Sequence, residues 1–599
     1  MRARGKRVAG LVEPLLTRGK RVAGRLGEPL LTLAAGLAAA IPVIAATVRA
    51  VQDGWVPVAD RGIIATRAHD VLTSHMPLVG QYTLAGEVTG NVTHSLGPML
   101  FWLLAIPAHA GSTVGMTVTV GALNTLCILG CVALARRRGG RALMVMTALA
   151  IALMCQSLAA ETFHDVWNPS AGLFPFTLLI FLCWSLACGE YRLLPLTVLV
   201  ASFVVQTHLT YLPPTLALLA VGFGGLAARW IVRRRRRAMT ETRRHEAGRD
   251  GHAEADAGAS ATAAPAAGSS RRSLVAWGLA TALVAALCWS ATLAEQLTEH
   301  PGNLTLVAEA ATRHKATLGS EVGWHAVVRS VGVVPWWLHT PASRWQRKYE
   351  VRSTPGALVS DTTIAMLAAL ALVGLAGVAR GRRDLAALAL IALVLCPALG
   401  AVAASTPTPR LLSATLGYTM WWGSQVGMIV WLTLAWALWL ALVGAARRAV
   451  NAKLGSVVLT LLGIAATAAI GATVAAAGTP DEHAVAYRPI KAIDARLAQL
   501  IPRGGSVLLE GALDGATMPV KPAVRYFLVA RGTRVLAPGS FLRLGSWYEL
   551  YDRPYREAIY LSDVPRPPVK YVQLAFHVSF REGSTPSTVY VWLSRTPGR

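Results

Sequence analysis

Ionisable side chains gather in one loop, residues 51–112, between two apolar parts of the chain. Among them are Asp60, Arg67, Asp70, Glu87 and His94. Asp60 follows the first apolar segment by about ten residues, so a short tether keeps its carboxylate near a membrane surface. A carboxylate can act as general base on a hydroxyl that comes within about 3 Å. We therefore expect Asp60 and Asp70 to be catalytic, and Arg67 and His94 to bind substrate.

The spacing of three of these residues favours one shared surface. Asp60, Arg67 and Asp70 are seven and three residues apart, so on a helix their side chains can point the same way. In the catalytic interpretation Asp60 is the base and Asp70 orients Arg67. The alternative is an ordinary Asp–Arg pair on a solvated helix.

A second polar loop, residues 161–170, reads ETFHDVWNPS. His164 and Asp165 are suited to bind a cation or an acceptor hydroxyl, and the ring of Trp167 offers a face on which a sugar can stack. One His–Asp pair is a weak metal signal, because Mg²⁺ and Mn²⁺ require several oxygen ligands. We expect no metal site and no cofactor, with a divalent cation kept as the alternative.

Further ionisable residues recur where later apolar segments end. They are His208, Glu295, His300 and Arg410. Such groups at membrane depth are costly and mark functional sites, although at a helix end they can also simply reach the lipid headgroups. Together they predict a cleft of carboxylates and cations suited to an anionic lipid headgroup.

The composition places these loops in a membrane protein. Of 599 residues, 54% are hydrophobic and 15% charged, which is typical of polytopic membrane proteins. The net charge of +26 comes largely from clusters that flank apolar segments, where basic residues are retained in the cytoplasm. These clusters are residues 136–138, 233–237, 380–383 and 447–453. We therefore expect a lipid bilayer, and no nucleic acid, as partner.

The apolar segments predict about eleven spans, because a membrane helix needs roughly 20 residues. They are residues 30–50, 113–135, 142–160, 172–188, 193–208, 212–231, 274–292, 361–379, 385–404, 418–445 and 455–477. Residues 98–110 are too few to span and are expected to form a helix along the outer surface. Every basic cluster then lies in the cytoplasm, while both polar loops and the C-terminal part lie outside.

The expected fold is an α-helical polytopic membrane protein with a small C-terminal extracytoplasmic α/β domain. Residues 238–272 are rich in Ala, Gly and Ser, which is typical of a disordered linker. The divisions are a basic cytoplasmic arm (1–29), a first membrane half (30–237), a disordered cytoplasmic linker (238–272), a second membrane half (273–478) with an outer loop (293–360), and the α/β domain (479–599).

In order and topology the chain resembles the GT-C superfamily of membrane glycosyltransferases, among them protein O-mannosyltransferases, the aminoarabinose transferase of lipid A and related actinobacterial proteins. The resemblance rests on the early Asp60, on the motif THSLGP (93–98) before a surface helix, and on the loop HDVWNPS (164–170). Many relatives have an Asp–Glu pair after the first span, whereas Arg61 follows Asp60 here. The subfamily and the sugar therefore stay open.

The resemblance implies a multi-pass cell-membrane enzyme that takes a sugar from polyprenyl phosphate. The first-loop carboxylate deprotonates an acceptor hydroxyl, which attacks the anomeric carbon and displaces polyprenyl phosphate with inversion. Arg410, His208 and Arg344 are expected to stabilise the leaving phosphate, and His94 to orient the acceptor or to contact that phosphate. The acceptor is a cell-envelope glycan, lipid or protein.

Two other functions fit the same topology, a transporter of lipid-linked glycan and a non-catalytic cell-envelope assembly protein. A transporter should carry charges at the bilayer midplane or broken spans in matching halves. Here the ionisable groups lie at one side of the membrane, which favours chemistry at that surface.

Overall fold

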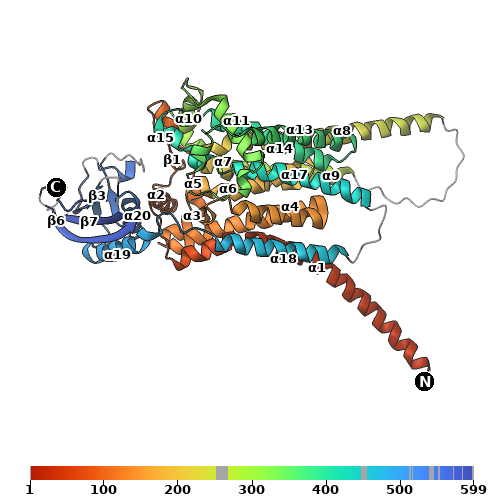
Figure 1. Cartoon of the computed structure of the whole chain (residues 1–599), viewed down its shortest axis with the longest axis horizontal. Coiled ribbons are helices and arrows are strands. Elements are labelled where there is room, and N and C mark those ends of the chain that lie inside the picture. The colour runs from red at the N-terminus through yellow and green to blue at the C-terminus, as the bar shows by residue number, and fades with distance from the viewer. Residues whose placement is uncertain are drawn as a thin grey trace.

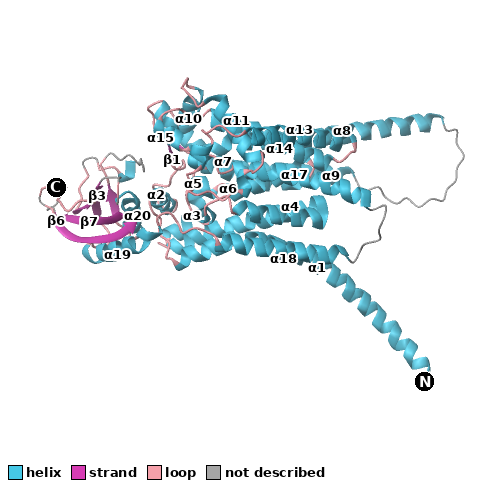
Figure 2. Cartoon of the chain, in the orientation of Figure 1, coloured by secondary structure: helices cyan, strands magenta, loops and turns pink. Residues whose placement is uncertain are grey.

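The protein is an elongated helical bundle with a small domain at one end, as the computed structural model shows (Figure 1). The structure describes residues 2–250, 267–343, 345–446, 455–511, 515, 517–538, 546–550, 553–570, 572–582 and 585–595. Within these residues, nine helices are long and apolar enough to cross a membrane. Figure 2 shows that the larger sheet is confined to the small domain. The expected polytopic helical class is confirmed at this level.

The bundle forms because a helix satisfies its own backbone hydrogen bonds, as a lipid environment demands. One helix, α6, lies at its centre, and all of its residues are buried. The long helices are α1 (Arg2–Gln52), α4 (Thr113–Cys155), α6 (Leu173–Ala187), α7 (Leu194–Thr207), α8 (Leu212–Asp250), α9 (Ala267–Thr298), α13 (Ala357–Ala379), α14 (Arg383–Ala404), α17 (Gly423–Ala446) and α18 (Gly455–Ala476).

Helix α4 folds back on itself at Gly140. There φ is 66° and ψ is −157°, a conformation that glycine adopts without steric cost. A straight helix of this length would span about 65 Å, yet the Thr117 hydroxyl lies 3.0 Å from Nδ1 of His164. Asn124 Nδ2 likewise donates to the carbonyl of Phe163 at 2.9 Å. The two arms correspond to the expected segments 113–135 and 142–160.

The basic clusters that the structure describes gather at the end of the bundle opposite the small domain. At the bend of α4, Arg136 Nη2 donates to Glu28 Oε2 at 2.7 Å, and Arg141 Nε donates to Glu28 Oε1 at 2.9 Å. Nearby, Arg137 pairs with Glu190 at 3.3 Å. Figure 1 places the N-terminus and the far end of α8 at this same end. The basic clusters at this end are therefore separated from the polar loops beside the small domain.

The segment expected as a disordered linker, 238–272, is partly helical. Helix α8 continues to Asp250 and α9 begins at Ala267. Residues 251–266, and the basic cluster 447–453, lie outside the described residues. The arm 1–29 continues directly into the first span as part of α1.

Short elements cover the other end of the bundle, beside the small domain. The predicted surface helix of residues 98–110 is present as α3. These elements are α2 (Asp60–Asp70), β1 (Tyr82–Thr83), η1 (Leu84–Val88), β2 (Thr93–His94), α3 (Met99–His109), η2 (Ala160–Phe163), α5 (Asn168–Ala171), η4 (Leu209–Tyr211), α10 (Asn303–Thr312), α11 (Gly319–Val331), η5 (Trp336–Leu338), α12 (Arg347–Glu350), α15 (Arg410–Ala414) and α16 (Leu416–Thr419). The turn η3 (Tyr191–Leu193) lies at the basic end.

The C-terminal domain is a five-stranded sheet with two helices, in the order β4-β3-β5-β7-β6. Strand β3 runs parallel to β4 and β5, and β7 runs antiparallel to β5 and β6. Its elements are α19 (Ala484–Leu500), β3 (Ser506–Gly511), α20 (Thr517–Ala530), β4 (Arg534–Leu536), η6 (Ser546–Tyr548), β5 (Glu557–Ser562), β6 (Gln573–Glu582) and β7 (Thr585–Arg595). In β7, the buried Val589 and Val591 lie on one face of the strand.

The predicted sidedness can be tested by cysteine labelling, because the seven native cysteines are all buried. Thr240 and Lys570 are exposed at opposite ends of the molecule. In intact cells, a membrane-impermeant thiol reagent should label Lys570→Cys and leave Thr240→Cys unlabelled until the cells are opened. The reverse pattern would place Asp60 in the cytoplasm.

Candidate active site

Asp60 is the first residue of α2, and its side chain is partly exposed. The preceding Ala59 has φ 48° and ψ −130°, which residues with a Cβ rarely adopt. Asp60 Oδ2 accepts a hydrogen bond from Trp167 Nε1 at 3.1 Å. Its Oδ1 accepts none from any residue that the structure describes. One oxygen of this carboxylate is therefore available to a ligand.

Beside it, Arg61 joins the two polar loops through a buried ion cluster. Its Nε donates to Asp165 Oδ1 at 2.9 Å, and its Nη2 donates to Asp165 Oδ2 at 2.7 Å. The same Nη2 donates to Glu161 Oε1 at 2.8 Å. The three residues are at most 4% exposed. Burial disfavours the charged guanidinium, but the two carboxylates outweigh it and raise the pKa of Arg61.

Asp165 is fully used by the protein. Besides the two bonds from Arg61, its Oδ1 accepts from the backbone N–H of Trp167 at 3.0 Å. Its Oδ2 accepts from the Ser170 hydroxyl at 3.2 Å. Because the residue has no exposed surface, a substrate hydroxyl cannot reach this carboxylate. Asp165 therefore orients Arg61 and Trp167 and does not face a ligand.

The same surroundings leave Asp60 more basic than an ordinary aspartate. Burial raises the pKa of Asp60, and the charge of Asp165 raises it further. Arg61 and the hydrogen bond from Trp167 lower the pKa but do not cancel the effect of burial. The result is a carboxylate with a raised pKa and one free oxygen, as a general base requires.

His164 connects the second loop to the start of the C-terminal domain. Its Nε2 lies 3.2 Å from Asp481 Oδ1, and Tyr487 donates to Asp481 Oδ2 at 2.8 Å. Burial lowers the pKa of His164, but the hydrogen bond and charge of Asp481 outweigh burial and raise it. Within the described residues, no group of three or more His, Cys, Asp or Glu side chains is arranged to hold a metal ion. His164 and Asp165, the suspected cation ligands, both have protein partners.

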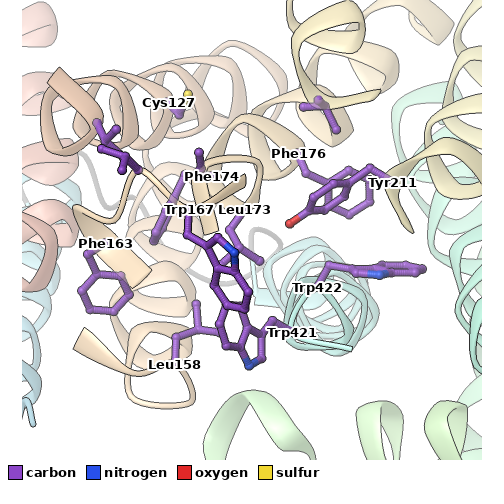
Figure 3. Close-up of a cluster of buried hydrophobic side chains, with 14 of the residues drawn as sticks. Cys127, Leu158, Phe163, Trp167, Leu173, Phe174, Phe176, Tyr211, Trp421 and Trp422 are labelled. Atoms are coloured by element: carbon purple, nitrogen blue, oxygen red, sulfur yellow. The ribbon is translucent and has the colours of Figure 1, made fainter. Parts of the chain in front are cut away.

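Four aromatic side chains form what we call the aromatic wall: Trp167, Trp345, Tyr418 and Trp421. The centroid of the Trp167 ring lies 4.9 Å from that of Tyr418, 5.9 Å from Trp421 and 6.3 Å from Trp345. Figure 3 shows Trp167 and Trp421 close together within a buried apolar cluster. The guanidinium carbon of Arg61 also lies 5.0 Å from the centroid of the Trp167 ring. Trp345 and Tyr418 are only partly buried, so the wall offers ring surface next to Asp60.

A cavity of about 380 Å³ lies against this wall, between α1, the end of α4 and α18. Trp345 lines the cavity and also contacts Trp167. Leu158 and Val474 are among the apolar residues that line the cavity, while Arg49 and Glu161 are charged residues in its lining. Its lining is therefore amphipathic.

The structure separates Asp70 and Arg67 from Asp60, which corrects the expectation that the three share one site. Asp70 lies at the other end of α2, about 15 Å along the helix axis. It is fully buried and accepts hydrogen bonds from Arg67 Nη1 at 2.8 Å and from the Tyr548 hydroxyl at 2.6 Å. The Asp70–Arg67 pair is present within α2, and Asp70 also binds Tyr548 of the C-terminal domain.

The remaining predicted residues are placed around the site rather than on Asp60. His208 packs edge-on against Tyr418 at 5.8 Å, and burial lowers its pKa to about 4, so it is neutral at pH 7 and supplies no positive charge to a phosphate. The backbone of His94 is bonded in both directions to Asn303 of α10, at 2.8 and 3.1 Å. Arg410 is exposed at the start of α15. Arg344 lies outside the described residues.

Sequence reasoning missed Arg61, Tyr418 and Arg347. Arg347 is buried, and its Nη1 donates to the backbone carbonyls of Met420 and Trp421 at 2.7 and 2.6 Å, so it fixes Trp421 in the aromatic wall. The position of Arg61 directly after Asp60 was the available signal. No local pattern marks Tyr418, since it contacts the wall only through the fold.

Removing the charge of Arg61 should strongly destabilise the protein, because two buried carboxylates would lose their partner. Breaking one side of a buried ion pair costs about 3–5 kcal/mol. We expect Arg61→Met to lower the thermal unfolding midpoint sharply in detergent. Arg382→Met is the control: Arg382 pairs with Asp384 at an exposed position, where a pair contributes about 0–1 kcal/mol.

Adding Asp165→Asn to Arg61→Met should restore part of the lost stability, because fewer charges remain unpaired. Equal unfolding midpoints for Arg61→Met and Arg382→Met would contradict the importance of the buried cluster.

Comparisons of the chain with protein-family models, with curated proteins and with solved structures find no match. A function for this chain is therefore inferred from the contacts among its own side chains.

Proposed function

We propose that the chain is a membrane glycosyltransferase of GT-C type that transfers a sugar from a polyprenyl-phosphate donor to an acceptor hydroxyl at the outer face. One observation carries this proposal: Asp60 is a partly exposed carboxylate with a raised pKa and a free oxygen. It lies beside an aromatic wall, as its hydrogen bond to Trp167 shows. A base next to a cluster of aromatic rings suits a reaction on a sugar, whose C–H faces pack on such rings.

In the proposed reaction, Oδ1 of Asp60 takes the proton of the acceptor hydroxyl. The hydroxyl oxygen attacks the anomeric carbon, and the bond from that carbon to the phosphate oxygen breaks, so that polyprenyl phosphate leaves with the bonding electrons. Trp167 holds the other carboxylate oxygen and thereby aims Oδ1. Arg61 stabilises the ionised base without contacting the substrate, because its own hydrogen bonds go to Glu161 and Asp165.

The donor's two chemical parts match two regions of the site. The cavity beside Trp345 has apolar sides for a lipid chain, and Arg49 belongs to its lining. Arg49, Arg410 and the predicted Arg344 are the candidates to neutralise the leaving phosphate, whereas the neutral His208 is not. The aromatic wall would receive the sugar ring. Which hexose or pentose it takes, and whether the acceptor is a glycan, a lipid or a protein, stays open.

The same proposal fixes the membrane arrangement. Counting the arms of α4 separately and adding the short α7 gives the eleven spans expected from the sequence. The basic end would face the cytoplasm by the positive-inside rule. Asp60, the aromatic wall and the C-terminal domain would then lie outside.

A transporter of lipid-linked glycan is the alternative, and one assay separates the two. Purified protein, given a polyprenyl-phospho-sugar and candidate acceptors, should release polyprenyl phosphate. A transporter in proteoliposomes would move the lipid-linked glycan across the bilayer with its sugar still attached. Movement without release would remove the enzyme proposal, and neither movement nor release would favour an assembly protein.

The variant Asp60→Asn should have a turnover rate about 10²–10⁴-fold lower than the wild type, which is the usual contribution of general base catalysis. Asparagine keeps the size of the side chain, and its carbonyl oxygen can accept the bond from Trp167, so donor binding should be nearly unchanged. The measurement is release of polyprenyl phosphate, with donor affinity determined separately. Asp53→Asn is the matched control, since Asp53 is an exposed acid of the same loop and should retain normal turnover.

Folded Asp60→Asn protein with near-normal turnover would remove Asp60 as the base. If Asp165→Asn also folded and alone abolished turnover, the base would move to the second loop.

The pH dependence of turnover should report the ionisation of Asp60. A base works when deprotonated, so kcat/KM should fall as pH falls through the raised pKa of Asp60, above the ordinary aspartate value of 3.8. The Trp167 hydrogen bond lowers that pKa. Trp167→Phe should therefore move the fall of kcat/KM on the acidic side of the pH profile, its acidic limb, to higher pH.

Trp345→Phe is the control for this shift, because Trp345 belongs to the aromatic wall but donates to Glu482, at 3.1 Å. Trp345→Phe should leave the acidic limb of the kcat/KM pH profile at its wild-type pH, even if the KM changes. A limb that moves equally in both variants would show that the shift arises from the wall in general.

A further inference from the structure

The helix that begins with Asp60 is seated on the C-terminal domain. At its first turn, the backbone N–H of Ala59 donates to the carbonyl of Pro519 in α20 at 3.1 Å. One turn further, Gly62 faces the backbone of Pro522 so closely that an added Cβ would lie 2.5 Å from the Pro522 carbonyl carbon. The start of α2 therefore touches α20 backbone to backbone, across more than 450 residues of sequence.

The other end of α2 is held by the same domain. The Tyr548 hydroxyl donates to Asp70 Oδ1 at 2.6 Å, and both side chains are buried. The ring of His75 stacks on Trp547 at 4.3 Å with 11° between the planes. Helix α2 is thus fixed at its two ends by α20 and η6.

A third contact ties the domain to the neighbouring helix α3. The hydroxyl of Tyr526 in α20 donates to the carbonyl of Ala108 at 3.0 Å, and this hydrogen bond is buried. Helices α2 and α3 therefore rest together on one face of α20. A domain that only presented an acceptor from a flexible tether would need none of these contacts.

We propose that the C-terminal domain is a positioning element of the active site, which holds α2 so that the Asp60 carboxylate stays against Trp167. For its catalytic meaning this inference rests on the proposed function. Gly62 and Tyr548 are positioning residues, because they act through α2 and do not touch a reacting atom.

The backbone at Ala59 gives the physical reason that such support is needed. A residue with a Cβ at φ 48° and ψ −130° is strained and persists only where its surroundings hold it. The Pro519 carbonyl supplies a hydrogen bond to that very residue. Without α20, the chain before Asp60 would relax and carry the carboxylate with it, and a displacement of about 1 Å can reduce turnover about 10²-fold.

The decisive variant is Gly62→Ala in the full-length protein. Alanine is the better helix former, so only the contact with Pro522 makes this change harmful. Gly356→Ala is the matched control, because Gly356 is exposed beside α13 and an added Cβ would meet no atom within 4 Å.

Two readouts are needed, one of which does not depend on turnover. The first is kcat and KM for release of polyprenyl phosphate. The second is labelling of Asp60 by a hydrophobic carbodiimide, which reacts with protonated carboxyl groups in apolar surroundings, followed over a pH series by peptide mass spectrometry.

Gly62→Ala should lower kcat about 10²-fold with little change in donor KM. It should also move the pH midpoint of Asp60 labelling downwards, because the displaced carboxyl becomes better hydrated. Gly356→Ala should match the wild type in both readouts. Folded Gly62→Ala protein that matches the wild type in both would overturn the proposal.

Tyr548→Phe provides the second test if Gly62→Ala does not fold. It removes one hydroxyl and keeps the ring, so the far end of α2 loosens without a clash, and a smaller shift in the same direction is expected. Wild-type kcat and labelling in folded Tyr548→Phe protein would then overturn the proposal. If labelling shifts while even the wild type releases no polyprenyl phosphate, the proposed function fails and the positioning of Asp60 stands.

Discussion

The buried charge of Arg61 is the constraint on which the rest of this site depends. A guanidinium removed from water is costly unless opposite charges and hydrogen bonds surround it. Arg61 obtains both from Glu161 and Asp165, which lie 100 and 104 residues further along the chain. The first and second loops must therefore fold against each other, and the fork of the guanidinium sets their relative orientation.

This pairing also explains why two neighbouring aspartates differ in chemical character. Asp165 accepts four hydrogen bonds and is inaccessible, so this carboxylate serves the structure. Among the residues that the structure describes, only Trp167 donates to Asp60, and the second carboxylate oxygen is left free. Arg61 acts on Asp60 only through its charge, without a hydrogen bond, and the charge of Asp165 repels the Asp60 carboxylate. The pKa of Asp60 therefore stays above that of an ordinary aspartate, because burial raises it as well. Because Arg61 pairs with Asp165, the Asp165 carboxylate is occupied and the Asp60 carboxylate stays available.

The sequence predicted what depends on composition and local pattern. Apolar length located the helices, basic clusters located one end of the bundle, and Asp60 and Trp167, which were singled out in two separate loops, are hydrogen-bonded to each other. Helical spacing failed for Asp70, because i, i+3 and i+7 relations indicate a face of α2 but not which of its ends meets the bundle. His208 lost its expected positive charge through burial, which is a property of the fold. Arg61 was noted only as a departure from an Asp–Glu pattern, since its partners lie about a hundred residues away.

A position between two structural units would meet the demands of the base that we propose Asp60 to be. A membrane helix fixes atoms only up to its last turn, and the loop beyond it would move by more than a proton transfer tolerates. Here the loop is made rigid from two sides: the ion cluster of Arg61 holds it to the bundle, and the carbonyl of Pro519 holds it to the C-terminal domain. If only one of these two contacts were present, α2 would be free to rotate about that contact. Both together fix the direction of the Asp60 carboxylate, so the small domain is as much a part of this site as the helices are.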